Sequence, residues 1–448
     1  MQITYKKILI EKINYYIVLL LAFWLPLYKP AIPYIIAALL VSWILEGGFK
    51  QKFSNVKWNK NLIIFILFYL IHLIGLLYSK NFNSGLFDVQ LKLSLIIFPV
   101  FFVTSNNLIR NNWKKILISF IIGCLISSLI CLSNAFYKSI FIHNNSIIFE
   151  PVINGYNNFC FILMSIFHNP TYYSMYLVFS IIIIISYFIN KKIRPEKKYQ
   201  YFLIFVFCVL IIMIYLSSSR AGIINAFIVL FSSLIIYLIR YKNYLKSILL
   251  FICIVLFANY SIINNSRLKF LPNKIVNNTN IIINEIKSKP DKDINIAIVD
   301  SINNANFPNI KISNKKKDVR LLIWDVSVNL IKNNFFTGVG TGDVKDELIL
   351  MYQNYEVGLA EKNDLNCHNQ YLETFVRLGV IGFILLLLIL ILPFIRAIKE
   401  KNYINLFFLI IISIHFIFES MLNTLAGVVF FSFFYSLLIL LPQQNKLK

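Results

Sequence analysis

The chain has 448 residues, of which 58% are hydrophobic, 16% aromatic and only 14% charged. Soluble domains are about 45–50% apolar and about 25% charged, so this composition excludes an ordinary soluble protein and indicates an integral membrane protein. The net charge of +23 does not indicate a nucleic-acid-binding protein. Its Lys and Arg residues lie in short clusters between apolar runs, as in a protein with many membrane spans, and not on one soluble face.

The apolar runs predict an all-α integral membrane protein with about 12 transmembrane helices, since one helical span requires about 20 residues. The first run follows a positively charged start without a small-residue cleavage site, so we expect it to be a retained helix and not a signal peptide. The predicted spans are 8–28, 30–46, 61–78, 89–105, 116–141, 170–190, 199–216, 223–239, 247–263, 374–395, 403–420 and 424–442.

The basic residues predict the orientation of these spans. Alternate connections, beginning with the N-terminus, contain 23 of the 43 Lys and Arg residues, whereas the opposite short connections contain only Lys29, Lys80, Lys92, Lys138 and Arg220. Cytoplasmic loops are enriched in Lys and Arg, so we expect both termini in the cytoplasm. The long connection 264–370 then lies outside, because long loops cross the membrane largely regardless of their charge.

This pattern divides the chain into three parts: a bundle of nine helices (1–263), a long periplasmic loop (264–370) and a bundle of three helices (371–448). Segment 264–317 is rich in Asn and Lys, and its role is not evident. After it, Val319, Leu322, Ile323, Val326 and Leu330 recur at helical spacing and predict an amphipathic helix.

Two further features surround the end of the long loop. The sequence FFTGVGTGD predicts a turn that ends a helix, because it lacks the residues of a dinucleotide or phosphate-binding loop. Asn363 or Asp364 is expected to cap a helix that runs through His368 into the tenth span. On that span Glu373 and Arg377 are four residues apart in the favourable order and are expected to neutralise each other.

Arg220 and Arg320 are the candidate anion-binding residues. Arg220, in LSSSRAG, interrupts two apolar runs at the outer membrane boundary, where a charge is normally paired or functional. The alternative is an arginine that extends to the lipid headgroups. Arg320 follows three lysines and is otherwise part of a solvated basic patch, although Trp324 stands four residues on and is placed to stack on its guanidinium group.

His368 is the only histidine of the long loop and is the candidate base. His72 and His415 lie inside predicted spans and are interpreted as core residues, and His143 as a surface residue. His168, in FHNPTYYSMYL, stands at the outer start of a span and is a candidate for the same cavity, as are Asn369, Trp324 and Asp364. A lone histidine is more often structural than catalytic, so His368 is a candidate only in combination with Arg220 and Arg320.

Two arginines and one histidine on the outer face fit the transfer of a glycan from a lipid diphosphate. Arginine is always charged and binds phosphate oxygens in a fork, so two arginines stabilise a diphosphate leaving group without a metal or cofactor. Histidine titrates close enough to neutral pH to take the proton of an acceptor hydroxyl. No His/Cys grouping at metal-ligand spacing is present in the sequence.

The order SRAG, R-x3-W, G-V-G and H-N-x2-L-x6-G-x2-G resembles the O-antigen ligase and polymerase superfamily, bacterial membrane glycosyltransferases of surface polysaccharide assembly. The resemblance implies that Arg220 and Arg320 hold undecaprenyl diphosphate and that His368 activates the acceptor hydroxyl. It also implies a multi-pass protein of the bacterial inner membrane with a periplasmic active site. In HNPTYYSMYL the family pattern is altered, because Asn169 separates His168 from Pro170.

The sequence does not decide which hydroxyl group accepts the glycan. A ligase transfers the glycan to lipid A core, a polymerase to a second lipid-linked repeat, and an O-oligosaccharyltransferase to a protein hydroxyl. We favour the ligase, with direct, inverting attack, and rank Asp364 as a rival nucleophile or base. A polysaccharide transporter is the alternative of another class, and it predicts mid-membrane charges, interrupted helices and internal repeats.

Overall fold

The computed structural model describes residues 2–54, 56, 58–105, 107–143, 146–153, 156–189, 196–241 and 319–441. The described chain is helical apart from two short antiparallel hairpins, which confirms the all-α prediction. The predicted span 247–263 and the segment 264–317 lie outside the described residues.

The long helices follow most of the predicted runs, whereas the four strands and the short helices between the runs were not predicted. The elements up to residue 139 are α1 (Gln2–Trp24), η1 (Lys29–Ala31), α2 (Ile32–Glu46), α3 (Phe49–Ser54), α4 (Lys60–Leu77), α5 (Phe82–Leu91), α6 (Ser94–Val103) and α7 (Asn107–Ser139). The next are β1 (Ile140–His143), β2 (Ser146–Phe149), β3 (Val152–Ile153), β4 (Tyr156–Asn157), α8 (Phe161–Met164), α9 (Pro170–Ile189), α10 (Lys197–Leu216) and α11 (Arg220–Tyr241). The last are α15 (Val319–Asn333), α16 (Val344–Asn354), α17 (Gly358–Lys362), α18 (Gln370–Lys399), α19 (Tyr403–Phe418), η3 (Met421–Asn423), α20 (Leu425–Tyr435) and η4 (Ser436–Leu440).

Eight helical segments of the described chain are long and apolar enough to cross a membrane. Two shorter apolar helical segments, Tyr403–Phe418 and Leu425–Leu440, coincide with the last two predicted spans. The protein is therefore a multi-pass helical membrane protein. The predicted span 89–105 differs most, because it is divided between α5 and α6 at Lys92.

Helix α9 lies in the centre of the bundle, and nearly all of its side chains are buried. Aromatic rings join it to its neighbours: the ring of Phe434 (α20) lies 4.7 Å from that of Phe179 (α9) and 4.8 Å from that of Phe120 (α7). The hydroxyl of Tyr176 donates to the carbonyl of Ala426 at 2.8 Å. These contacts explain why the apolar, aromatic-rich sequence packs as one bundle.

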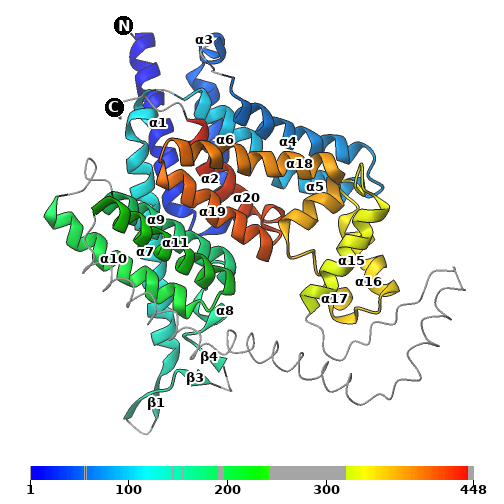
Figure 1. Cartoon of the computed structure of the whole chain (residues 1–448). Coiled ribbons are helices and arrows are strands. Elements are labelled where there is room, and N and C mark those ends of the chain that lie inside the picture. Colours follow the sequence, from blue (N-terminus) through cyan, green and yellow to red (C-terminus); the bar gives the residue numbers. More distant parts are fainter. Residues whose placement is uncertain are drawn as a thin grey trace, which may run out of the picture.

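The predicted amphipathic helix is confirmed as α15. Its buried residues Leu322, Ile323, Val326 and Leu330 pack with α16 and α17 in a separate small core that reaches Val376 of α18. In Figure 1 the start of α1 and α3 lie at one end of the molecule, and the hairpins and α8 lie at the other, with α7 running between them. Helices α15–α17 gather beside α5 and the start of α18 (Figure 1).

The FFTGVGTGD segment is more than a turn that ends α15. Gly379, inside α18, has φ of +63° and ψ of −162°, so the helix is interrupted there, and the segment fills the interruption. Val339 N–H donates to the carbonyl of Val376 at 2.8 Å, and Val380 N–H donates to that of Phe335 at 2.9 Å. A Cβ atom at Gly379 would overlap the carbonyl of Phe336, so only glycine fits this contact.

Candidate active site

His368 stands in the short turn between α17 and α18. Its φ of +45° is uncommon for a residue with a side chain, although His is enriched among such exceptions. The N-cap of α18 is Asn369, whose Oδ1 accepts from the backbone N–H groups of Tyr371 (2.9 Å) and Leu372 (3.2 Å). The predicted cap at Asn363 or Asp364 and a helix through His368 are therefore wrong, because Asn369 satisfies the first free N–H groups of α18.

A carboxylate lies beside the ring of His368. Nδ1 is 3.4 Å from Oε1 of Glu419, and both side chains are largely buried. The contact is electrostatic and not a hydrogen bond, since Nδ1 has no hydrogen-bond partner among the described residues. The charge of the carboxylate still favours a proton on Nδ1, the nitrogen beside it, which leaves Nε2 as an acceptor. Sequence reasoning missed Glu419, although a lone acidic residue between two apolar runs is a signal that deserved weight.

Arg220 is the first residue of α11, directly after the buried turn Ser217–Ser219, and its side chain is half-buried. Ser218 has a φ of +50°, and its Oγ lies 3.3 Å from Sγ of Cys160. Gly222, in the first turn of α11, packs directly on Ser174 of α9. The small residues of LSSSRAG therefore bring the start of α11 against the start of α9.

One contact relates the helix of Arg220 to the helix that ends beside Glu419, the partner of His368. Asn225 Nδ2 of α11 lies 2.8 Å from Nδ1 of His415 of α19. Arg220 precedes Asn225 by five residues and Glu419 follows His415 by four, which corresponds to about 6–8 Å along each helix axis at 1.5 Å per residue. Glu419 interacts electrostatically with Tyr172 of α9, and Gly222 packs on Ser174 two residues later, so Arg220 and Glu419 both lie near the start of α9.

Arg320 is related to His368 through α15. Trp324, one helical turn after Arg320, donates its indole N–H to the carbonyl of Cys367 at 3.1 Å. Cys367 is also contacted by Ser327, whose Oγ lies 3.3 Å from its Sγ. Burial and the charge of Glu373 raise the pKa of the Cys367 thiol, so this cysteine is an inert packing residue. Trp324 thus ties the start of α15, with the half-buried Arg320, to the residue before His368.

His168 is a buried residue between α1 and α9. Its ring lies edge-on to Tyr176 at 5.2 Å and hydrogen-bonds to the backbone of Leu25. Burial lowers the pKa of His168 to about 4, so the ring is neutral at physiological pH. The structure places this candidate in the packing of the bundle, apart from the His368 and Glu419 pair.

Asp364 is exposed at the far side of the same turn. It forms an ion pair with Lys345 at 2.8 Å, and it has a φ of +49°. It lines a cavity of about 260 Å³ whose lining also includes Asn366, Glu373 and Arg377, but not Arg220, Arg320 or His368.

The predicted pair of Glu373 and Arg377 is confirmed at 2.7 Å, but it is buried and belongs to a larger network. Arg377 also lies 2.7 Å from Asp88 of α5, and Lys92 donates to both oxygens of Asp88. Arg377 further donates to the carbonyl of Thr341 at 3.0 Å. This network joins α5, α18 and the GVGTGD part (residues 338–343) of the FFTGVGTGD segment.

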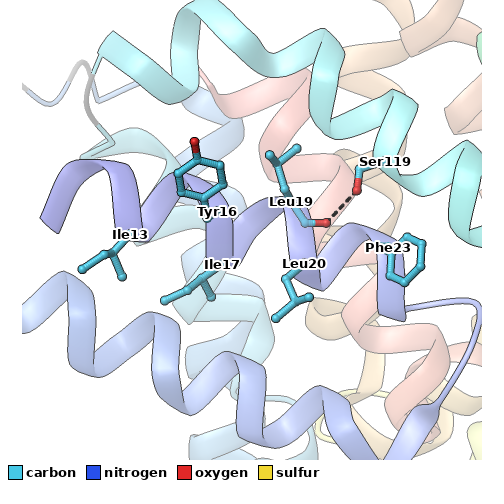
Figure 2. A pocket seen from close by; sticks show the side chains of 7 residues that line it. All are labelled: Ile13, Tyr16, Ile17, Leu19, Leu20, Phe23 and Ser119. Atoms are coloured by element: carbon cyan, nitrogen blue, oxygen red, sulfur yellow. Dashed lines mark hydrogen bonds between the residues drawn. The ribbon is translucent and has the colours of Figure 1, made fainter. Parts of the chain in front are cut away.

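A larger cavity, of about 560 Å³, opens between α1 and α7. Its lining is six apolar or aromatic residues of α1 together with Ser119 of α7. Figure 2 shows that the Ser119 hydroxyl is directed at the carbonyl of Leu19, to which it donates at 2.8 Å. This cavity therefore offers apolar surface but no group for chemistry.

Within the described part of the chain, no three His, Cys, Asp or Glu side chains are grouped to hold a metal ion. Residues 204–387 match the sequence profile of the family described as O-antigen ligase. The matched region contains Arg220, Arg320 and His368. A search among curated proteins finds no match.

Proposed function

We propose that this chain, a member of the O-antigen ligase and polymerase superfamily through residues 204–387, transfers a glycan from undecaprenyl diphosphate to an acceptor hydroxyl. The proposed acceptor is lipid A core, and the proposed location is the periplasmic face of the bacterial inner membrane. The observation that carries the proposal is the His368 and Glu419 pair, with Nδ1 and Oε1 3.4 Å apart. Helix α11, which begins with Arg220, contacts His415 four residues before Glu419, and helix α15, whose second residue is Arg320, contacts Cys367 directly before His368.

In the proposed mechanism Glu419 holds the proton of His368 on Nδ1, and Nε2 accepts the proton of the acceptor hydroxyl. The acceptor oxygen attacks the anomeric carbon as the bond from that carbon to the diphosphate oxygen breaks. Undecaprenyl diphosphate leaves with the bonding electron pair, and Arg220 and Arg320 stabilise its negative charge. Direct attack inverts the anomeric centre and requires neither a covalent intermediate nor a metal ion.

Polymerase and protein O-oligosaccharyltransferase activities are the alternatives within the same chemistry, since all three use the same donor. Asp364 is a weaker candidate for the base than His368, because it is exposed and already paired with Lys345.

A polysaccharide transporter is supported by two observations, the buried charges of Asp88, Lys92, Glu373 and Arg377 and the interruption of α18 at Gly379. We favour the enzyme. Glu373, Arg377 and Gly379 all lie within ten residues of the start of α18, and the GVGTGD segment closes the interruption with backbone hydrogen bonds.

The proposal is tested by deleting the gene and separating the extracted lipopolysaccharide by gel electrophoresis. Loss of all long chains with accumulation of lipid-linked polymer is expected for a ligase. Single repeats on lipid A core would indicate a polymerase, and an unchanged ladder would contradict both. Activity of the purified protein should persist in EDTA.

A further inference from the structure

The cavity of about 260 Å³ lies between α5, the start of α16 and the first turns of α18. The turn that holds His368 forms one wall. Asn366 lines the cavity, and its Oδ1 accepts from the backbone N–H of His368 at 2.9 Å. Glu373 also lines it, and its Oε2 accepts from the backbone N–H of Cys367 at 3.3 Å. The cavity and the candidate base are therefore built on the same few residues.

The inner end of the cavity is polar and charged. Arg377 lies between Asp88 and Glu373, at 2.7 Å from each. Lys92 supplies a second cation to Asp88. The two carboxylates are therefore compensated by protein cations and separated by Arg377, so they do not form a site for a metal ion. Glu373 is only 1% exposed, but Asp88 still offers one acceptor to a neutral hydroxyl, because an ionised carboxylate has about four lone-pair sites and Lys92 and Arg377 occupy three of them.

The lining also contains apolar residues, namely Phe87 of α5, Val344, Leu348 and Leu365. Phe87 is 68% exposed and stands where an aromatic face is available to a ligand. An aromatic side beside carboxylate and amide groups suits a sugar ring, which has apolar C–H faces and hydroxyl groups around its edge.

The charges do not favour an anionic ligand. The lining residues Asp88, Asp364 and Glu373 are acidic and Lys345 and Arg377 are basic, and Lys92 adds a third cation beside Asp88. A phosphate would therefore meet no net positive charge, unlike at Arg220 and Arg320. The volume also limits the ligand, since drug-sized molecules occupy pockets of about 300–1,000 Å³ and this cavity is slightly smaller.

We propose that this cavity is a subsite for one neutral sugar ring of the acceptor glycan. The assignment to the acceptor rests on the proposed function, in which the two arginines take the donor diphosphate. A sugar in the cavity lies beside the turn that holds His368, because Asn366 belongs to both. Its binding helps to deliver the attacking hydroxyl to His368 and thereby supplies part of the orientation that glycosyl transfer requires.

The test is binding of neutral methyl glycosides, namely those of glucose, galactose, N-acetylglucosamine and a heptose, to the full-length protein in nanodiscs. Saturation-transfer NMR at millimolar concentration detects such weak ligands. Ser84→Trp is designed to fill the cavity from α5. The matched control is Asn83→Trp, at the neighbouring exposed position that does not line it. Phe87→Ala removes the aromatic face without adding volume, and thermal unfolding verifies that each variant is folded.

We expect at least one glycoside to bind wild type and Asn83→Trp equally, to lose at least 10-fold in affinity in Ser84→Trp, and to bind Phe87→Ala more weakly. His368→Ala should bind it as wild type does, so this test does not depend on the chemistry at His368. Equal binding by Ser84→Trp, no binding of any glycoside, or binding of pyrophosphate that Ser84→Trp abolishes would overturn the proposal. Retained glycosyl transfer by His368→Ala would instead contradict the proposed function and leave the sugar binding standing.

Discussion

At the scale of single residues, Glu419 is the side chain that distinguishes a catalytic His368 from a structural one. If Glu419 orients the ring, Glu419→Gln should lower kcat by about 10²-fold, at the lower end of the roughly 10²–10⁴ that general acid–base catalysis contributes. The KM for the donor should change little, and Glu419→Asp should restore part of kcat. Kinetics of the reconstituted protein give both constants, and a change confined to KM would argue against a positioning role.

The buried His168 predicts how the free energy of unfolding changes with pH. Its folded pKa of about 4 lies below the usual 6.5, so protons bind the unfolded chain first as the pH falls. The stability contributed by the neutral ring is complete above about pH 6.5 and is lost between about pH 6.5 and pH 4, at most roughly 3 kcal/mol. His168→Gln should flatten this dependence in thermal unfolding scans while leaving glycosyl transfer largely intact. A pH profile identical to that of wild type would contradict the packing role.

Some of these residues were accessible from the sequence and others were not. Arg220, Arg320 and His368 stay predictions from the sequence: Arg220 because a charge at a membrane boundary is costly, Arg320 because Trp324 follows it by four residues, and His368 because it is the only histidine of the long loop. The turn at His368 was mispredicted, because Asn363, Asp364 and Asn369 are all good capping residues and only tertiary contacts select among them.

At the scale of elements, the interruption of α18 at Gly379 holds α15 and α16 on the bundle, because the segment between these two helices bonds to the backbone there. Gly379→Ala should destabilise the protein by at least about 3 kcal/mol, because it combines a backbone conformation restricted to glycine with steric overlap. The matched control is Gly358→Ala in α17, where a Cβ atom would meet nothing within 4 Å. Thermal unfolding of the purified variants checks this, and equal stability of the two would contradict the account.

Periodicity predicted α15 well, since its buried positions are those at helical spacing. It did not predict the interruption of α18, because G-x2-G in an apolar run is equally consistent with close packing of a continuous helix. The contact that decides between them comes from Phe335 to Val339, some forty residues earlier in the sequence.

At the scale of the whole molecule, a periplasmic active site requires α3 and the β1–β2 hairpin on opposite sides of the membrane, with the hairpin outside. In a variant whose six native cysteines are replaced, Ile147→Cys should react with a membrane-impermeant maleimide in cells with a permeabilised outer membrane. Lys50→Cys, exposed on α3, should react only after lysis. The reverse pattern would place the proposed site in the cytoplasm.

The central claim is that His368 performs the proton transfer while Arg220 and Arg320 hold the diphosphate. The most direct measurement is glycan transfer by the reconstituted protein, with a lipid-diphosphate-linked glycan as donor and lipid A core as acceptor. We predict that His368→Ala lowers kcat by at least about 100-fold with little change in the KM for the donor. Arg220→Ala and Arg320→Ala should reduce kcat/KM for the donor by a similar factor. Transfer at the wild-type rate by His368→Ala, or by both arginine variants, would contradict the account.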